Sequence, residues 1–429
     1  MKRFLTALAA LLAVLSAAGQ EKTMPEQSGF SFAGFPMLGY DADNGLRLGL
    51  ATNVYDFGKS GYPNPRQQVF AEASWSLKGS QAYVLGYDNR FLIPGIRFTF
   101  AAQYADDKAF DFYGFNGYQS YYDAGLPSSY YRISRKHPAA KLDFTGKIAG
   151  NLYWKFGYHF HYFIIDEYQN ENLQEVPYGV TLFEWYKKMG FIASDEFSGG
   201  MTSAWRGGLC YDSRDAEAMP SRGIWADAFM EWAPKWMGTN KPYGRWYFVW
   251  RNYLPIASDK LVFAYRADVQ GFIGSPAFYV LSFDPVLGPG YDREGYGGYN
   301  TVRGLMRNRV QGKTVCSFNT ELRWRFLDRE VLGQHLAFGA NAFFEGARVL
   351  QDYGDVSVNG TVWSGPIAEG RFPAQLTRGT AERFHLTAGA GLRVILNKNF
   401  IIAVDYGRAF NRQDNGKGGA LYFNTGYLF

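Results

Sequence analysis

The sequence lacks the long apolar run that a membrane-spanning helix requires. Beyond its first twenty residues it has no stretch of about 18 consecutive apolar side chains, and segments with a helical hydrophobic period are scarce. A helical membrane bundle is therefore not expected. The net charge of +5, from 44 basic and 39 acidic residues, is too small to indicate a nucleic-acid partner.

Cysteine is equally sparse, with only Cys210 and Cys316 in the chain. Two cysteines in an exported protein suggest a disulfide bond. Alternation along the expected strands places Cys210 on a polar face with Arg206, and Cys316 on an apolar face with Phe318. The two thiols would point to opposite sides of the sheet, so we expect no bond between them.

The first residues have the composition of a secretory signal. Lys2 and Arg3 precede an apolar run from Phe4 to Leu15, and small residues follow at 16–19. The run is too short to cross a bilayer. We therefore expect a signal peptide at 1–19, a short periplasmic stub at 20–29 and one domain over 30–429.

Aromatic residues and glycine are abundant. Phe, Trp and Tyr make up 18% of the chain, and there are 50 glycines. An exported chain of this composition without a spanning helix fits an all-β, transmembrane antiparallel β-barrel. Apolar residues alternate with polar or small ones in about sixteen segments. These expected strands lie near 30–39, 45–55, 67–78, 81–90, 94–105, 130–148, 151–165, 201–211, 222–234, 243–255, 259–272, 314–327, 334–349, 382–396, 400–410 and 418–429.

Long and short links alternate between these strands. The long links are 106–129, 166–200, 273–313 and 350–381, and the tight ones are 91–93, 149–150, 256–258 and 397–399. Barrels of the outer membrane have short periplasmic turns and longer outer loops. The alternation predicts a multi-pass barrel in the cell outer membrane with both chain ends in the periplasm.

Charged residues share one face of the expected strands. Asp405, for example, alternates with the apolar Val404 and Tyr406. A charge on the lipid face at mid-depth would cost about 2–4 kcal/mol, so the charged face must line the lumen. The alternative is a soluble barrel with an apolar interior. The last segment opposes it, because an aromatic face there runs to Tyr427 and Phe429.

The segment Gly295–Lys313 combines five glycines with four cations. Glycine permits tight turns, and buried guanidinium groups need anions or water. We expect this segment to fold into the lumen, where Arg303 would pair with Glu345 or, as second choice, with Glu321. Arg323 lies on the same face as Glu321. The alternative, that these are separately solvated lumen charges, stays open.

Other chemistry is weakly indicated. His159 and His161 share a strand face, but no nearby carboxylate or thiol completes a metal site, so we expect no metal and no cofactor. Nothing couples a serine to a histidine, so we expect no enzyme. The segment Leu182–Met189 fits either a short helix in an outer loop or a surface aromatic patch.

Several motifs resemble those of one family. Val302, Arg303, Gly304 and Leu305 look like the VRGF/VRGY loop motif of the BamA/TamA-like outer-membrane barrel superfamily, the bacterial surface antigens. Glu321 with Arg323 resembles its E-x-R motif, and Phe343–Val349 resembles F-x-D-x-G-x-V with Glu345 for Asp. A turn similar to D-T-R-D…P-x-R-G contains Asp212, Arg214, Asp215, Arg222 and Gly223. Tyr427 and Phe429 fit a C-terminal strand signal.

The resemblance covers essentially the whole mature chain. It implies a sixteen-strand barrel whose loop tip is held in the lumen by an Arg–acid contact. Family members that insert or secrete proteins carry periplasmic POTRA domains, for which the stub at 20–29 leaves no room. We therefore expect a POTRA-less barrel that inserts, assembles or translocates proteins or lipids.

Such a barrel would work with outer-membrane lipids and with separate periplasmic or outer-membrane protein partners. Two other functions remain open. One is a passive channel or structural barrel plugged by 295–313, and the other is a lipid-modifying enzyme of the outer membrane.

Overall fold

A computed structural model describes residues 29–41, 45–59, 65–77, 79–168, 176, 179–217, 219–288, 290–331, 334–356, 374–396, 400–425 and 427–429. The expected signal peptide at 1–19 and residues 20–28 of the stub lie outside the described residues.

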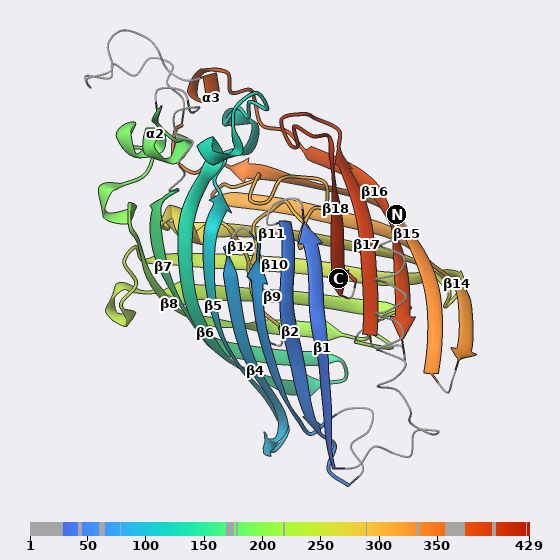
Figure 1. Cartoon of the computed structure of the whole chain (residues 1–429). Coiled ribbons are helices and arrows are strands. Elements are labelled where there is room, and N and C mark those ends of the chain that lie inside the picture. The colour runs from blue at the N-terminus through green and yellow to red at the C-terminus, as the bar shows by residue number, and fades with distance from the viewer. Residues whose placement is uncertain are drawn as a thin grey trace.

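Sixteen strands form one antiparallel sheet, as the alternation predicted. The strands are β1 (Phe30–Asp41), β2 (Gly45–Asp56), β3 (Gln67–Ser76), β4 (Gln81–Ile93), β5 (Ile96–Asp111), β6 (Arg132–Ala149), β7 (Leu152–Glu167), β8 (Gly199–Asp212), β9 (Gly223–Ala233), β10 (Tyr243–Ser258), β11 (Leu261–Gly274), β14 (Thr314–Val331), β15 (Gln334–Gln351), β16 (His385–Leu396), β17 (Phe400–Ala409) and β18 (Gly419–Thr425). Each pairs with the next strand of this series, and the sheet curls around so that β18 comes to lie next to β1 (Figure 1). Between β11 and β14, the short strands β12 (Phe283–Asp284) and β13 (Arg293–Glu294) form a separate hairpin.

The two faces of the sheet have opposite character. Large apolar side chains are exposed on the outer face, among them Leu48, Trp75, Met230, Trp324 and Leu392. Charged side chains are buried on the inner face, among them Arg135, Asp143, Arg206, Glu231 and Arg266. This is the arrangement of a lipid-facing barrel rather than a soluble one. Cys210 is buried and Cys316 is half-buried, and both are free thiols.

Long links gather at one end of the barrel, where α2 and α3 also lie (Figure 1). Their helical turns are η1 (Gly117–Gln119), η2 (Ser128–Tyr131), α2 (Leu182–Lys188), η5 (Ser194–Glu196), η6 (Lys235–Met237), η7 (Phe278–Val280) and α3 (Ala374–Thr377). We call this the long-loop end and the opposite end the short-turn end. In the part of the chain that the structure describes, no helix has the length and apolar character needed to cross a bilayer.

The sequence left the segment Leu182–Met189 open between a short helix and a surface aromatic patch, and the structure shows a helix, α2. The Thr181 hydroxyl accepts the N–H of Glu184, and the Glu184 carboxylate accepts the N–H of Thr181, which is a capping box. Trp185 and Tyr186 are 1% exposed and pack in a large aromatic cluster with residues such as Phe112. The segment is therefore a short helix, and its aromatic side chains are not a surface patch. The cluster covers the long-loop end.

The first and last strands of the sheet, β1 and β18, lie side by side but are not paired as the other neighbouring strands are. β1 and β18 have Cα atoms within 8 Å of each other. In the described residues, β1 is hydrogen-bonded to β2 and β18 to β17, and no ladder joins β1 to β18. β18 has 7 residues, against 12 in β1. We call this boundary the seam.

Candidate functional site in the barrel lumen

The connection between β11 and β14, residues 275–313, lies inside the barrel, and we call it the lumenal loop. Lys141 of β6 donates to the backbone oxygen of Gly288 at 2.5 Å, and Lys155 of β7 donates to that of Leu287 at 3.0 Å. Arg303 bonds to strands β14, β15 and β17. A segment held by strands so far apart around the sheet must lie within the lumen.

Arg303 binds three carboxylates at once. Its main-chain N–H and its Nε donate to the two oxygens of Glu345, at 2.6 and 3.0 Å. Its Nη1 donates to Asp405 at 3.1 Å, and its Nη2 contacts both Glu345 and Glu321. The guanidinium also lies 3.8 Å over the Phe343 ring. The structure thus brings Arg303 together with both of its expected partners and adds Asp405, which the sequence did not indicate.

Two further arginines balance the charge of these acids. Arg393 donates to both oxygens of Asp405, at 2.9 and 3.0 Å. Arg323 donates to the second oxygen of Glu321 at 2.7 Å. Burial lowers the pKa of Arg303, but the carboxylates around it outweigh burial and raise the pKa, so this side chain stays charged. We call Arg303, Arg323, Arg393, Glu321, Glu345 and Asp405 the arginine cluster.

Glycine lets the loop approach the wall closely. Gly304 has φ +97°, and a Cβ there would lie 2.9 Å from the backbone nitrogen of Arg408. Its N–H donates to the Tyr422 hydroxyl at 3.0 Å, and its carbonyl accepts from Asn415 at 3.0 Å. The flanking apolar residues of the motif, Val302 and Leu305, are buried with Tyr296, Val310, Val315 and Val349. The predicted motif therefore forms the contact between loop and wall.

The chain end turns inward instead of continuing the last strand. β18 ends at Thr425, whereas the sequence predicted a strand to 429 with its aromatic residues toward lipid. Phe429 is only 7% exposed and packs against Tyr253 on the inner wall. Arg323 donates to the backbone oxygen of Phe429 at 2.8 Å and lies over the rings of Tyr427 and Phe429. The expected lipid-facing position is therefore wrong, because a buried cation attracts these rings to the lumen.

The predicted turn motif lies between β8 and β9. Arg214 donates from Nε and Nη2 to the two oxygens of Asp212, at 2.9 and 2.7 Å. Asp215 accepts the N–H of Arg222 at 3.3 Å. Gly223 has φ +106°, and a Cβ there would meet a carbonyl oxygen at 2.4 Å. These contacts all lie within or next to the turn, so the motif shapes the turn itself.

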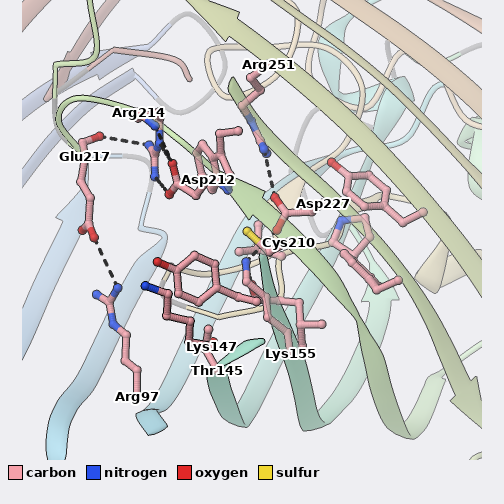
Figure 2. Close-up of a pocket in the computed structure, with 18 of the residues that line it drawn as sticks. Arg97, Thr145, Lys147, Lys155, Cys210, Asp212, Arg214, Glu217, Asp227 and Arg251 are labelled. Carbon is pink, nitrogen blue, oxygen red and sulfur yellow. Dashed lines mark hydrogen bonds and ion pairs between the residues drawn. The ribbon is translucent and has the colours of Figure 1, made fainter. Parts of the chain in front are cut away.

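A chamber of about 780 Å³ lies beneath the lumenal loop at the short-turn end (Figure 2). Its walls include strands β4 to β10, and loop residues 285–293 form its other side. Seven cations line it, namely Arg90, Arg97, Lys147, Lys155, Arg214, Arg251 and Arg293. Its described lining has three carboxylates, Asp212, Glu217 and Asp227. We call it the basic chamber.

Some of these cations share their acids. Lys155 Nζ and Arg251 Nη1 both donate to Asp227, at 2.7 and 3.1 Å (Figure 2). Arg251 also stacks 3.8 Å over the Trp225 ring. One carboxylate thus serves two cations, which leaves the inner wall of the chamber positively charged. The strand pattern could not show this excess, because the cations come from separate strands and meet only in the fold.

A loop carboxylate lies beside the two histidines of β7. Ring nitrogens of His159 and His161 and an oxygen of Asp292 lie within 4.8 Å of one another, a grouping that could hold a metal ion. The expectation that no carboxylate lies nearby is therefore wrong. Arg206 already donates to both oxygens of Asp292, at 2.7 and 2.6 Å, and His159 Nε2 lies 2.7 Å from Asp143. The Arg206 bonds tie the loop to β8 without an ion, and the His159 contact joins β7 to β6.

Besides the bonds from Lys141 and Lys155 to its backbone, two sets of ion pairs fix the lumenal loop. Arg303 attaches it to β14, β15 and β17, and Asp292 attaches it to β8. The ionisable groups at both places are paired with opposite charges, an arrangement suited to holding a segment in position. These ion pairs can therefore hold the lumenal loop inside the barrel, where it fills the lumen.

Comparisons with known proteins identify a matching family and similar folds. Residues 67–429 match the family model described as the Omp85 superfamily domain. The fold is similar to "BamA from Haemophilus ducreyi lacking POTRA domains 1-3", with TM-score 0.55 and 15% identity, over 93% of this chain and 70% of that one. It is also similar to CdiB from Escherichia coli, with TM-score 0.56 and 11% identity, over 94% of this chain and 63% of that one. Among curated proteins none matches this chain.

The two similar structures share so little sequence with this chain that they show only a common fold. The family match also shows membership of the family, because it covers most of the chain and includes the loop motif, the E-x-R strand and the turn motif. The resemblance to BamA/TamA-like barrels is thereby confirmed. This chain belongs to the Omp85 superfamily of outer-membrane β-barrels.

Proposed function

We propose that this barrel inserts, assembles or translocates proteins or lipids at the outer membrane, without enzymatic chemistry. Its long-loop end would face outward and both chain ends would lie in the periplasm, as the sorting of long and short links favours. Separate periplasmic or outer-membrane proteins would act as its partners, and the barrel would work in contact with the outer-membrane lipids around it.

The observation that supports this proposal is the seam. Strand edges with unpaired N–H and C=O groups accept additional strands, which is a common mode of peptide recognition. At the seam, β18 offers only 7 residues to its neighbours, and the described residues of β1 and β18 share no ladder. Opening here would break few hydrogen bonds and would expose two edges to a client strand in the membrane plane.

The arginine cluster would keep the lumen closed while the seam opens. Tyr422 of β18 accepts the N–H of Gly304, so the lumenal loop touches the last strand directly. Asp405 on β17 binds Arg303. The strands beside the seam are thus held from inside, and the loop would act as a brace for the open form.

A disulfide lock at the seam tests the proposal. Cysteine pairs placed between β1 and the outward-facing Leu421 or Phe423 of β18 would be scanned for oxidation, in a background with both natural cysteines replaced. A pair at Gly34 and Thr52 is the control, because these residues are partners in the β1–β2 ladder. The readout is the rate at which a urea-denatured outer-membrane barrel folds into vesicles containing this protein.

The proposal predicts that the oxidised seam pair removes any acceleration of folding and that a reductant restores it. The oxidised control pair should keep full acceleration. An acceleration that survives the locked seam would contradict the proposed route.

One observation favours a second function. The lumenal loop fills the interior and is bonded to several strands, as a plug would be. A plugged channel should conduct ions in planar bilayers and should not speed the folding of other barrels. The two measurements made on one preparation separate these functions.

A further inference from the structure

The basic chamber has more positive charge than its acids can balance. Its described lining has seven cationic side chains and three carboxylates. One further acid outside the lining, Asp88, pairs with Arg97 through two bonds of 2.9 and 2.6 Å. Apart from Lys147 at the mouth, the remaining excess lies deep in the chamber, where charges are screened less than at an open surface.

Single nitrogen atoms of two arginines in the chamber have no hydrogen-bond partner. Nη1 of Arg293 is buried without a hydrogen bond, and its ion pair with Asp284 is long, at 4.0 Å. That carboxylate is already bound to Arg266 at 2.7 Å. Nε of Arg251, a residue 4% exposed, is also buried without a hydrogen-bond partner. Burial and the neighbouring Arg266 lower the pKa of Arg293, which reflects the same shortage of negative charge.

Lys147 adds an exposed cation near the mouth of the chamber (Figure 2). Glu217, at the same end, has a side chain that is 63% exposed, so this side of the chamber is open to water. A ligand could therefore enter from the short-turn end and reach Lys147 before the deeper arginines.

The size and the remaining lining restrict the ligand. A volume of about 780 Å³ falls within the range of small-molecule sites and far exceeds one inorganic ion. Tyr153 and Tyr291 add aromatic surface next to the cations. A ligand that fits has a multiply charged anionic group joined to a larger organic part.

We propose that the basic chamber binds a phosphate ester: Lys147 attracts it at the mouth, Arg293 and Arg251 hold its phosphate, and its organic part lies against the aromatic wall. A phosphate group offers three acceptor oxygens and up to about two charges, whereas a carboxylate offers two oxygens and one charge. The charge of Arg251, from a strand, acts on that of Arg293, from the loop. A phosphate matches this pair of cations better than a carboxylate does. This inference does not depend on the proposed transport function.

Two sources could supply this chemistry, an anionic phospholipid headgroup or a soluble phosphate ester. The first measurement is titration calorimetry of the purified full-length barrel in a phosphate-free detergent, with inorganic phosphate, sn-glycerol 3-phosphate and sodium glutamate as probes. The second is native mass spectrometry after exposure to vesicles of phosphatidylglycerol with phosphatidylcholine, which counts the lipids that stay bound.

The test variant is the double substitution K147Q/R293Q, which leaves the bonded ion pairs of the wall intact. The control is K235Q/R329Q, which removes the same charge at two exposed positions outside the chamber. Heat-modifiability on gels verifies that both variants fold. If the double variant does not fold, K147Q and R293Q are tested singly.

We expect glycerol 3-phosphate to bind at one site, and K147Q/R293Q to weaken it by about tenfold or more, since each charged hydrogen bond contributes strongly. The control should match the wild type. Phosphatidylglycerol that is retained by the wild type and control but lost by the double variant identifies the lipid source. Equal retention in all three, with glycerol 3-phosphate binding still impaired, identifies a soluble ester.

Two results would overturn the proposal. One is that neither phosphate probe binds, or that both bind the double variant as well as the wild type. The other is that glutamate binds as tightly as glycerol 3-phosphate with the same dependence on Lys147 and Arg293, which would assign the chamber to acidic peptides.

Discussion

Gly304 of the lumenal loop and Gly407 of β17 meet backbone to backbone. A Cβ on Gly407 would lie 2.8 Å from the carbonyl carbon of Arg303, and a Cβ on Gly304 would lie 2.9 Å from the backbone nitrogen of Arg408. These two glycines set how near the loop comes to the wall. That distance in turn lets the Arg303 side chain reach carboxylates on three strands.

Replacing Gly304 with alanine should therefore destabilise the barrel. The substitution adds a collision with β17 to the strain of a positive φ, and we expect a loss of about 2–4 kcal/mol in the free energy of unfolding. Gly354→Ala is the control, because Gly354 has φ +66° and no atom within 4 Å of its added Cβ. Urea unfolding followed by tryptophan fluorescence measures both. Equal losses would show that the close approach contributes nothing.

Arg303 and Glu345 should be energetically coupled. Each is nearly or fully buried, so Arg303→Ala or Glu345→Gln leaves a buried charge short of a partner and should cost about 3–5 kcal/mol. The double variant should cost clearly less than the sum of the two, because the second change removes the charge left by the first. Additive losses in a double-mutant cycle would mean that the two side chains do not act on each other.

The chain end should contribute to stability from inside the lumen. Phe429→Ala removes a buried ring and one face of the Arg323 contact, for an expected loss of about 3–4 kcal/mol. Leu421→Ala, on the outer face of β18, is the comparison and should cost less in detergent, where apolar molecules replace the lost contact. Refolded protein and urea titration give both values. A larger loss for Leu421→Ala would contradict the inward position of Phe429.

Asp292 should make the barrel sensitive to acid. Burial opposes its charge, but Arg206 outweighs burial and holds the pKa of this carboxyl well below its usual range. A carboxyl whose pKa is lowered on folding stabilises the protein above its usual pKa near 4, and this contribution is lost as the pH falls further. Asp292→Asn should therefore cost about 3 kcal/mol at pH 7 and progressively less below pH 4. The urea midpoints of both proteins at pH 7 and pH 3 test this, and a difference independent of pH would refute it.

The wall of the barrel was predictable from sequence. Strands such as β9 and β16 keep a strict alternation because one face meets lipid and the other meets buried charge, so a single misplaced residue is costly. The sorting of links by length follows from the same topology. The loop motif could be assigned to the lumen because four cations need anions that only an enclosed polar interior supplies.

Contacts inside the lumen were not predictable in the same way. Asp405 and Asp292 join the site only through the fold, and no local period marks a residue that bonds far along the chain. Phe429 follows an alternating segment, yet Arg323 on another strand draws it inward. The segment Leu182–Met189 fitted a short helix or a surface aromatic patch equally well, because the sequence of a loop does not reveal what covers it.

The central claim is that Arg303 holds the lumenal loop in place inside the barrel. Single-channel recording of Arg303→Ala in planar bilayers, beside the wild type and Lys235→Ala, tests it most directly. The account predicts a larger conductance, or frequent openings, for Arg303→Ala alone, because the loop loses its bonds to β14, β15 and β17. A conductance trace for Arg303→Ala that matches the wild type, in protein that is equally resistant to heat on gels, would contradict it.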